Sequence, residues 1–396
     1  MKENIFELTN EELKAIANNL QEKIELGLEK DSTEILCIPT YINPKDELEA
    51  GRVLALDWGG TNFRAAIVEL IPGKEPVIVE TKKKLLSAKE VIGFSKDDLF
   101  EEMAKVIGSL ENLDNQVTRI GYCFSYPAEC STDGDATLIR WTKNIEIHDL
   151  VGGLVGKLLM DYLNNHPSIP TTFTDIKVIN DTVACLFAGL ADVGKDAYIG
   201  LIVGTGTNMA GLMHTNKIAK LNYKGRGLMP VNLESGNFNP PYLTVIDGLV
   251  DAMSNNKGSQ RFEKAISGGY IGEIFKTVFS DKKIKYDFDG ENLSKIMNNP
   301  QDHPEDYVNV ATWLFARSAK LVAASLVGLI QVLLSHDSTI KNVCLAADGS
   351  VFWLSSKDYN QQVADQMKAL LPADVSVSIT ELNEPNLIGS AIAAMS

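Results

Sequence analysis

The tripeptide Gly-Thr-Asn occurs at residues 60–62 and again at 206–208, and each copy follows an apolar run. The first run, 52–57, reads R-V-L-A-L-D, and the second, 198–203, reads Y-I-G-L-I-V. Another apolar run begins directly after each tripeptide. A glycine turn between two such runs is typical of a β-hairpin. The repetition predicts two similar halves, each with a hairpin that faces a shared cleft.

Apolar runs typical of strands alternate with segments that have the apolar spacing of amphipathic helices. The first helix is expected after Thr9, where T-N-E-E forms a capping box with Glu12, and it should extend to about Leu28. Such alternation indicates an α/β protein with largely buried sheets. Besides the two hairpins, we expect strands at 117–124, 177–179 and 343–347, and helices at 96–110, 152–164, about 308–334 and from about 387.

Charge and cysteine content disfavour several classes of function. The 37 Lys and Arg residues against 52 Asp and Glu give a net charge of −15, which argues against general nucleic-acid binding. Five cysteines without C-x-x-C spacing and five isolated histidines disfavour a disulfide framework or a zinc site. The N-terminus shows no apolar signal segment, and the longest apolar stretch, 321–334, is too short to cross a bilayer. We therefore expect a cytoplasmic protein.

Three groups of polar residues follow apolar runs. The turn at 57–62, D-W-G-G-T-N, could hold phosphate on backbone N–H groups, although alone it is equally a structural turn. Neither a P-loop nor a G-x-G-x-x-G that opens a helix is present. Asp181 follows the strand-like V-I-N, where α/β folds place ligands, although a helix N-cap is locally the commoner role for such an aspartate. Glu234 and Glu263 lie in two polar segments. Each segment, considered alone, is typical of a surface loop.

Eight motifs together resemble the hexokinase family, and they occur in that family's order between about residues 50 and 355. Two departures from the family's usual pattern are Trp58, where Leu is common, and E-P-N-L-I-G-S-A near the C-terminus, which lacks the glycine-rich G-S-G-x-G. The motifs are L-A-L-D-W-G-G-T-N-F-R, F-S-Y-P, W-T-K-N, V-I-N-D-T, G-L-I-V-G-T-G-T-N, V-N-L-E-S-G-N-F, S-G-G-Y-I-G-E and D-G-S-V.

The resemblance implies a two-domain kinase of the actin-like, ribonuclease-H-like fold, with a central cleft that closes around a hexose and MgATP. The smaller domain would hold residues 50–181 plus 386–396, and the larger would hold 1–49 plus 182–385. The implied reaction transfers the γ-phosphoryl group of MgATP to the 6-hydroxyl of a hexose, with glucose expected, as in the first step of glycolysis. A sugar sensor and an actin- or chaperone-like ATPase are the alternatives, and the sugar-binding motifs disfavour the ATPase.

The same resemblance assigns roles to individual residues. Asp181 would accept the proton of the sugar 6-hydroxyl, and Lys143, unless it is a solvated surface lysine, would place a cation near the transferring phosphoryl group. Asp57 would orient Mg²⁺ through water. Binding of the sugar is assigned to Ser125, Thr142, Lys143, Asn180, Asp181, Asn208, Glu234 and Glu263. Binding of the nucleotide is assigned to Asp57, Gly59, Gly60, Thr61, Asn62 and Arg64 in the first hairpin, to Thr205 and Gly206 in the second, to Gly268 and Gly269, and to Asp348, Gly349 and Ser350 on the adenosine side.

Overall fold

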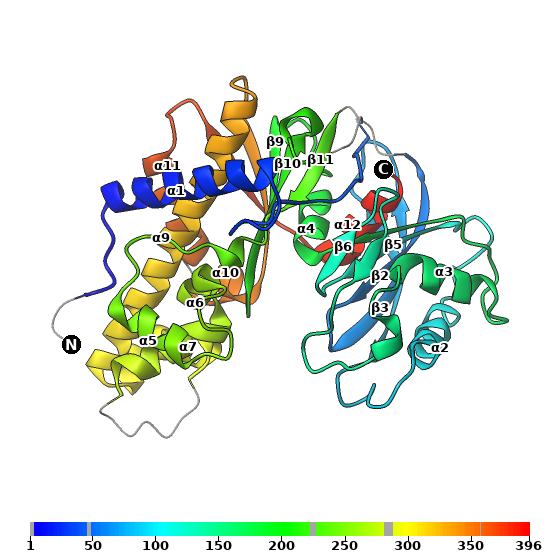
Figure 1. The fold of residues 1–396 in the computed structure, drawn as a ribbon, viewed down its shortest axis with the longest axis horizontal. Coiled ribbons are helices and arrows are strands. Elements are labelled where there is room, and N and C mark those ends of the chain that lie inside the picture. The colour runs from blue at the N-terminus through cyan, green and yellow to red at the C-terminus, as the bar shows by residue number, and fades with distance from the viewer. Residues whose placement is uncertain (1–3, 46–48, 222–226, 281–287, 357) are drawn as a thin grey trace.

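Two separate β-sheets organise the chain, and each contains one of the two predicted hairpins (Figure 1). The computed structural model describes residues 4–45, 49–221, 227–280, 288–356 and 358–396. The sheets lie in different halves of the molecule, which we call the first lobe and the second lobe. The repeated tripeptide thus marks the same kind of hairpin in both lobes.

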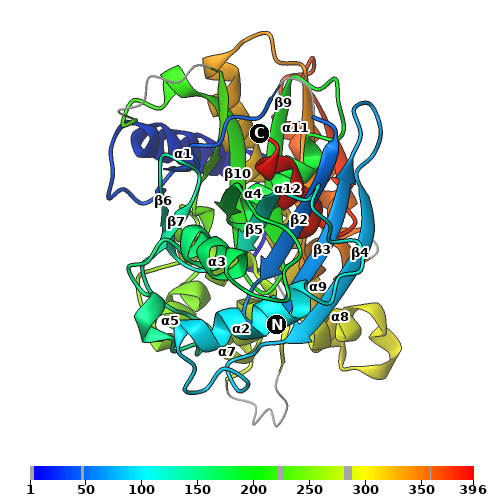
Figure 2. The ribbon, with the colours of Figure 1, turned by 90° about the vertical axis from the view of Figure 1, so that its right-hand side faces the viewer.

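The first lobe is a five-stranded sheet with helices on both faces. In spatial order its strands are β4 (Val77–Leu85), β3 (Asn62–Leu70), β2 (Gly51–Trp58), β5 (Arg119–Phe124) and β8 (Asp175–Ile179). Helices α2 (Lys96–Ile107) and α3 (Val155–Asn164) lie on one face, and α12 (Pro385–Ala394) lies on the other (Figure 2). A short hairpin of β6 (Ala128–Cys130) and β7 (Ala136–Leu138) follows β5.

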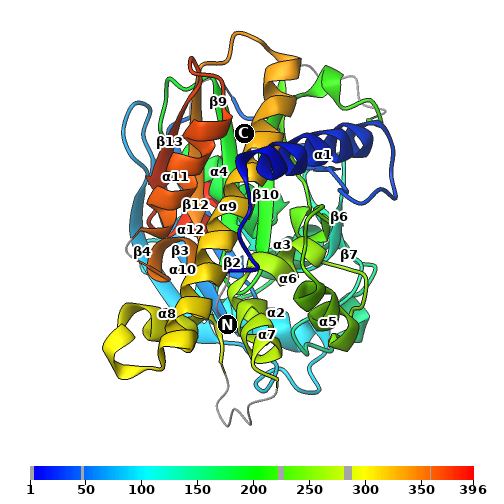
Figure 3. The same ribbon diagram turned by 90° about the vertical axis from the view of Figure 1, so that its left-hand side faces the viewer.

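The second lobe is a six-stranded sheet with one helix on its inner face and longer helices on its outer face (Figure 3). In spatial order its strands are β1 (Ile38–Pro39), β11 (Leu228–Asn232), β10 (Thr207–His214), β9 (Ala197–Val203), β12 (Asn342–Asp348) and β13 (Ser376–Glu381). Its main helices are α4 (Asp181–Gly189) on the inner face, and α9 (Glu305–His336), α11 (Tyr359–Leu370) and α1 (Asn10–Glu29) on the outer face. The others are α5 (Val245–Met253), α6 (Arg261–Ile266), α7 (Gly268–Val278), α8 (Gly290–Asn298) and α10 (Ser350–Leu354).

The predicted strands and helices are confirmed to within a few residues at their ends. The capping box at Thr9 forms, because its side chain accepts a hydrogen bond from the N–H of Glu12 while the Glu12 carboxylate binds the N–H of Thr9. The apolar stretch near residue 330 belongs to α9, which is longer than predicted. Within the described residues α9 alone is long and apolar enough to cross a membrane, but 78% of its most apolar window is buried inside the protein. The expected buried core helix is therefore confirmed.

Helices α4 and α12 pack against each other between the two sheets, and they join the lobes (Figure 1). Glycine allows close approach here: a Cβ added at Gly389 of α12 would lie 1.8 Å from the carbonyl oxygen of Ala184 in α4. A Cβ at Gly121 of β5 would lie 1.9 Å from the carbonyl oxygen of Ser390 in α12. Helix α12 packs on the first lobe and α1 on the second. We therefore propose the domain boundaries expected from the sequence, with residues 50–181 and 386–396 in the smaller domain and 1–49 and 182–385 in the larger.

Replacing Gly389 with alanine should destabilise the protein, because the new methyl group would meet backbone rather than a flexible side chain. We expect Gly389→Ala to lower the free energy of unfolding by about 2 kcal/mol, as overpacking of a core does. Urea unfolding measures the change. Gly248→Ala in α5 is the matched control, since a Cβ there meets nothing within 4 Å, and alanine favours a helix. Equal unfolding midpoints for Gly389→Ala and the unchanged protein would contradict the close packing.

Candidate active site

The first hairpin places Asp57 and Arg64 opposite each other on adjacent strands β2 and β3. The Arg64 guanidinium donates to Oδ2 of Asp57 from Nε at 2.8 Å and from Nη2 at 2.6 Å. The side-chain amide of Asn386 donates to the other oxygen, Oδ1, at 3.1 Å. Arg64 also pairs with Glu384, which precedes α12. Both carboxylate oxygens of Asp57 are therefore engaged, and α12 supplies part of the network.

Lys143 crosses the tip of this hairpin. Its ammonium group donates to the carbonyl oxygens of Gly59 at 2.8 Å and Ser125 at 3.0 Å. The side chain runs over Gly60, where φ is 101° and a Cβ would lie 2.8 Å from Cδ of Lys143. The backbone of Lys143 itself lies in the left-handed region, with φ of 58°. The lysine is thus held against the hairpin by two backbone carbonyls, which a freely solvated surface lysine would not be.

An aromatic cluster supports the segment that carries Lys143. The rings of Trp58, Phe124, Tyr126 and Trp141 pack in a cluster of tilted and edge-to-face contacts. The centroids of Tyr126 and Trp141 are 4.8 Å apart, edge to face, and those of Trp58 and Tyr126 are 5.3 Å apart, tilted. Trp58 is fully buried, and its indole N–H donates to the carbonyl oxygen of Leu86 at 3.1 Å. The unusual tryptophan after Asp57 therefore belongs to the core beneath the W-T-K segment.

Asp181 is the first residue of α4, and it is not the N-cap. The N-cap, which was the locally commoner alternative for Asp181, is Asn180: its side-chain oxygen accepts from the N–H groups of Thr182 at 2.9 Å and Val183 at 3.1 Å. The Oδ1 atom of Asp181 accepts from the Asn180 amide at 2.9 Å and from the Thr182 N–H at 2.8 Å. The asparagine therefore takes the capping role and also orients the aspartate.

Burial raises the pKa of Asp181, while the nearby Lys143 ammonium opposes that rise and the Asp57 carboxylate adds to it. Such a carboxyl takes up a proton more readily than an ordinary aspartate. A pKa raised toward the working pH is what a general base needs. Its burial, modified by the nearby cation and the second carboxylate, therefore makes Asp181 chemically suited to act as a base.

Glu234 and Glu263 of the second lobe are linked electrostatically to Asp181. Burial raises the pKa of both carboxyls; Asp181 raises the pKa of Glu234 further, and Glu234 does the same for Glu263. Glu263 accepts from the N–H of Thr207 at 3.0 Å, and Glu234 accepts from the Asn232 amide at 2.8 Å. The Asn232 side-chain oxygen in turn accepts from Asn208 at 2.8 Å. The carboxyls of Asp181, Glu234 and Glu263 thus interact electrostatically.

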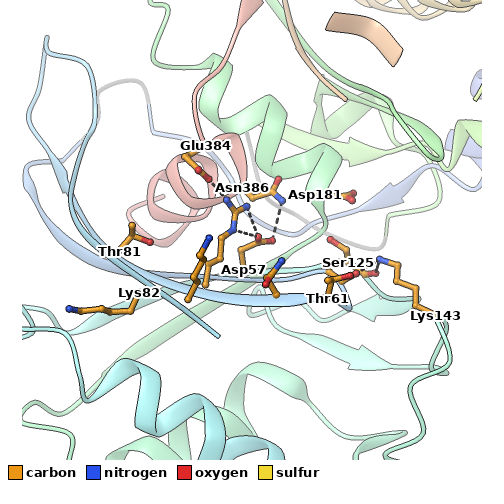
Figure 4. A pocket seen from close by; sticks show the side chains of 13 residues that line it. Asp57, Thr61, Thr81, Lys82, Ser125, Lys143, Asp181, Glu384 and Asn386 are labelled. Atoms are coloured by element: carbon orange, nitrogen blue, oxygen red, sulfur yellow. Dashed lines mark hydrogen bonds and ion pairs between the residues drawn. The ribbon is translucent and has the colours of Figure 1, made fainter. Parts of the chain in front are cut away.

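A cavity of about 680 Å³ lies beside the first hairpin (Figure 4). The structure brings eight predicted site residues to it. They are Asp57, Gly59, Thr61, Asn62, Arg64, Ser125, Lys143 and Asp181. Five lining residues were not predicted, namely Thr81, Lys82, Lys83, Glu384 and Asn386. Arg140 was also missed, although its charge lowers the pKa of Glu234 against the effect of burial. Thr142, Asn180, Asn208, Glu234 and Glu263 do not line this cavity.

The second hairpin gathers the other predicted nucleotide residues. The N–H of Gly268 donates to the carbonyl oxygen of Gly204 at 2.8 Å, and that of Gly269 donates to Thr205 at 3.0 Å. Gly349 has φ of 111°, and a Cβ there would lie 2.3 Å from the carbonyl oxygen of Val203. Thr205, Gly206, Asp348 and Ser350 belong to the same turns. These residues lie together, but outside the cavity, and the N–H groups of Gly268 and Gly269 are bonded to the hairpin.

The residues around Asp57 fit a magnesium ion held largely by water and phosphate. Both oxygens of Asp57 already accept hydrogen bonds, which suits contact with a hydration water better than direct ligation. Among the described residues, no three His, Cys, Asp or Glu side chains gather as a metal site. Magnesium commonly binds through one or two carboxylates, several waters and substrate phosphates. Asp57 would be the residue that holds it here.

Comparison with known proteins gives consistent matches along the whole chain. Two family models described as hexokinase match residues 2–190 and, in two overlapping parts, 198–302 and 290–396. Hexokinase-1 of Mus musculus is 34% identical over 289 residues, which cover 70% of this chain and 29% of that protein. The matched region is thus under a third of the length of this mammalian relative. Hexokinase-9 of Oryza sativa subsp. japonica is 29% identical and matches 97% of this chain and 86% of its own.

The solved structure of a hexokinase from Schistosoma mansoni complexed with glucose superposes with a TM-score of 0.78 at 24% identity, covering 99% of this chain and 96% of that one. The likeness shows the fold, which is the two-domain, actin-like fold of sugar kinases. The family models show to which family the chain belongs, because each half of the chain matches one of them. The chain belongs to the hexokinase family.

Proposed function

We propose that the protein transfers the γ-phosphoryl group of MgATP to the 6-hydroxyl of a hexose, giving hexose 6-phosphate and ADP. The observation that carries this proposal is Asp181, a carboxyl of raised pKa at the start of α4, beside Lys143 and a glycine hairpin. Glucose is the proposed hexose, and the glucose complex of the Schistosoma mansoni hexokinase supports it. The proposed role is the first step of glycolysis, and a cytoplasmic location stays a prediction.

In the proposed mechanism Asp181 accepts the 6-hydroxyl proton as the hydroxyl oxygen bonds to the γ-phosphorus. The bond from that phosphorus to the bridging oxygen breaks, and ADP leaves. Phosphoryl transfer has a loose transition state, so positioning and charge stabilisation provide most of the catalysis. Lys143 supplies positive charge near the moving phosphoryl group. Magnesium, when bound, neutralises charge on the phosphates; Asp57 would orient it through water.

The proposed sugar site draws residues from both lobes. Ser125, Thr142, Lys143, Asn180 and Asp181 would bind hydroxyls from one side, and Asn208, Glu234 and Glu263 from the other. Carboxylates and amides suit hydroxyls because they accept or donate hydrogen bonds as each hydroxyl requires. The nucleotide would lie on the two hairpins, with Gly268, Gly269, Asp348, Gly349 and Ser350 toward the adenosine.

Asp181→Ala should abolish most turnover while glucose still binds. We expect kcat to fall by at least about 10²-fold, which is typical for loss of a positioned general base. ADP production is followed with MgATP and glucose, mannose, fructose, N-acetylglucosamine or no sugar, and glucose binding is followed by calorimetry. Asp161→Ala, which removes only a surface partner of Lys157, should behave as the unchanged protein. A near-normal kcat in Asp181→Ala would refute the assignment, and turnover without sugar would indicate an ATPase.

Lys143→Met should move the acid limb of the activity profile to higher pH. The Lys143 charge holds the pKa of Asp181 below the value that burial alone would give, so removing that charge raises the pKa. The base then becomes protonated, and inactive, at a higher pH than in the unchanged protein. The measurement is kcat/KM for glucose against pH, which reports the free enzyme. Lys157→Met on the surface is the control, and an unmoved acid limb would show that Lys143 does not act on Asp181.

Glucose should draw the two lobes together, since its proposed ligands are divided between them. We expect a smaller radius of gyration in small-angle scattering with glucose than without it, because closure excludes water from the phosphoryl donor. A Glu234→Gln, Glu263→Gln double variant, which loses both carboxylates of the second lobe, should contract less at the same glucose concentration. If the radius of the unchanged protein stays constant at saturating glucose, closure is not part of the mechanism.

A further inference from the structure

Helix α5 of the second lobe has its acidic side chains inside and large apolar side chains outside. A surface helix ordinarily turns its apolar stripe toward the core and its charged residues toward water. In α5 the two acidic residues, Asp247 and Asp251, are each 5% exposed. Val245, Leu249 and Met253, at i, i+4 and i+8 and so on one face of the helix, are 80%, 48% and 69% exposed. The helix is therefore reversed relative to an ordinary surface helix.

Ion pairs hold α5 in this orientation. Asp247 accepts a hydrogen bond at 2.8 Å from Nη1 of Arg317 in α9, and that arginine is itself buried. Asp251 accepts from Nζ of Lys264 at 2.7 Å and from Nη1 of Arg261 at 3.1 Å, both in α6. Breaking a buried pair is strongly destabilising because it leaves an uncompensated charge. The helix therefore cannot rotate to bury its apolar face within the same chain.

The apolar face continues past the start of α5, since Tyr242 is 52% exposed. We call Tyr242, Val245, Leu249 and Met253 the α5 row. Figure 3 shows α5 at the surface of the second lobe, beside α6 and α7, and the α5 row does not line the cavity of the candidate active site. Apart from the two buried aspartates, the only charged residue in 239–260 is Lys257. Scarcity of charge together with tyrosine and methionine is typical of the centre of a protein interface.

The size of the α5 row suits an interface between two proteins. Four side chains of this kind, about half to four-fifths exposed, present on the order of 500 Å² of apolar surface. A standard interface covers about 800 Å² on each partner, and somewhat more than half of that area is apolar. The α5 row alone therefore provides the apolar part of one side of such an interface.

The chain itself offers the matching surface. Elsewhere in the described chain no other helix carries more than one large exposed apolar side chain, and the remaining ones are spread over both lobes, from Ile5 to Leu354. The apolar surface that matches the α5 row is thus the α5 row of another copy, as in a twofold interface, where the same patch lies on both sides. Two copies of net charge −15 repel each other, so they meet best where acidic residues are absent. Lys257, which is exposed next to α5, has the sign that suits the acidic surface of a second copy.

We propose that α5 is the contact surface of a symmetric dimer, in which the α5 row of one copy packs on the α5 row of a second copy. The contact removes both rows from water, which is favourable for apolar surface. It leaves no new carboxylate unpaired, because Asp247 and Asp251 are already bonded on the inner side of the helix.

Val245→Glu tests the proposal in the full chain. Sedimentation equilibrium of the unchanged protein should show a mass that rises with concentration from 43.3 kDa toward twice that value. Val245→Glu should raise the dissociation constant of the dimer at least about 30-fold, as for loss of a central interface residue, because the charge enters from both copies. The fold should be retained, since Val245 is the first helical residue after the N-cap Thr244 and glutamate is favourable there.

Two further variants make the test specific to α5. Ile92→Glu is the matched control, because it makes the same change at a side chain that is 78% exposed in the first lobe, and it should leave the dissociation constant unchanged. Met253→Glu, at the other end of the α5 row, should weaken the dimer as Val245→Glu does. Circular dichroism of each variant confirms that its helix content is retained.

Three results would overturn the proposal. A dimer that stays equally tight in both Val245→Glu and Met253→Glu would place the interface elsewhere on the chain. Equal weakening by Ile92→Glu would show that added negative charge alone separates the copies. A protein that remains monomeric at every concentration, with and without glucose, would exclude a second copy as the occupant and leave the α5 row to a different protein.

Discussion

Close packing through the middle of the molecule determines where the reactive groups lie. It joins the first sheet to α12, α12 to α4, and α4 to the second sheet. Gly121 lets α12 approach the first sheet, and Gly389 lets α4 approach α12. The N-terminal ends of these two helices carry Asp181, at the start of α4, and Asn386, which binds Asp57. The contact between the lobes is therefore also what brings Asp181 near enough to Asp57 for each carboxylate to affect the other.

The two cations of the site, Arg64 and Lys143, interact with different carboxylates. Arg64 is fixed by Asp57 and Glu384, so it neutralises the hairpin carboxylate rather than the base. Lys143 is fixed by the carbonyls of Gly59 and Ser125, which carry no net charge, and its field can therefore act on Asp181. Backbone carbonyls orient a lysine without neutralising it. In the proposed mechanism, this separation would let Asp57 contact the hydration shell of a metal ion while Asp181 remains a base.

The sequence predicts the hairpins because glycine turns interrupt apolar runs, and the order of motifs identifies the family. It does not predict β4 or β13, since both are edge strands whose residues are mostly exposed or half-buried and form no apolar run. Glu384 and Asn386 were missed for another reason: Asn386 meets Asp57 from 329 positions along the chain. The local sequence left the cap open, because Asn and Asp are comparable N-caps and V-I-N-D alone cannot decide between them. In the structure Asn180 is the cap, and Asp181 lines the cavity.

The three interacting carboxyls explain why sugar binding and closure should be coupled. Beyond the effect of burial, Asp181 raises the pKa of Glu234, and Glu234 raises the pKa of Glu263. Without a ligand, bringing the lobes together would increase this repulsion and remove water that solvates the charges. Sugar hydroxyls can donate hydrogen bonds to the same oxygens and replace that water. In the proposed mechanism, the carboxyls would therefore oppose closure of the empty site and favour closure around a polyhydroxyl ligand, which would then shield the phosphoryl donor from water.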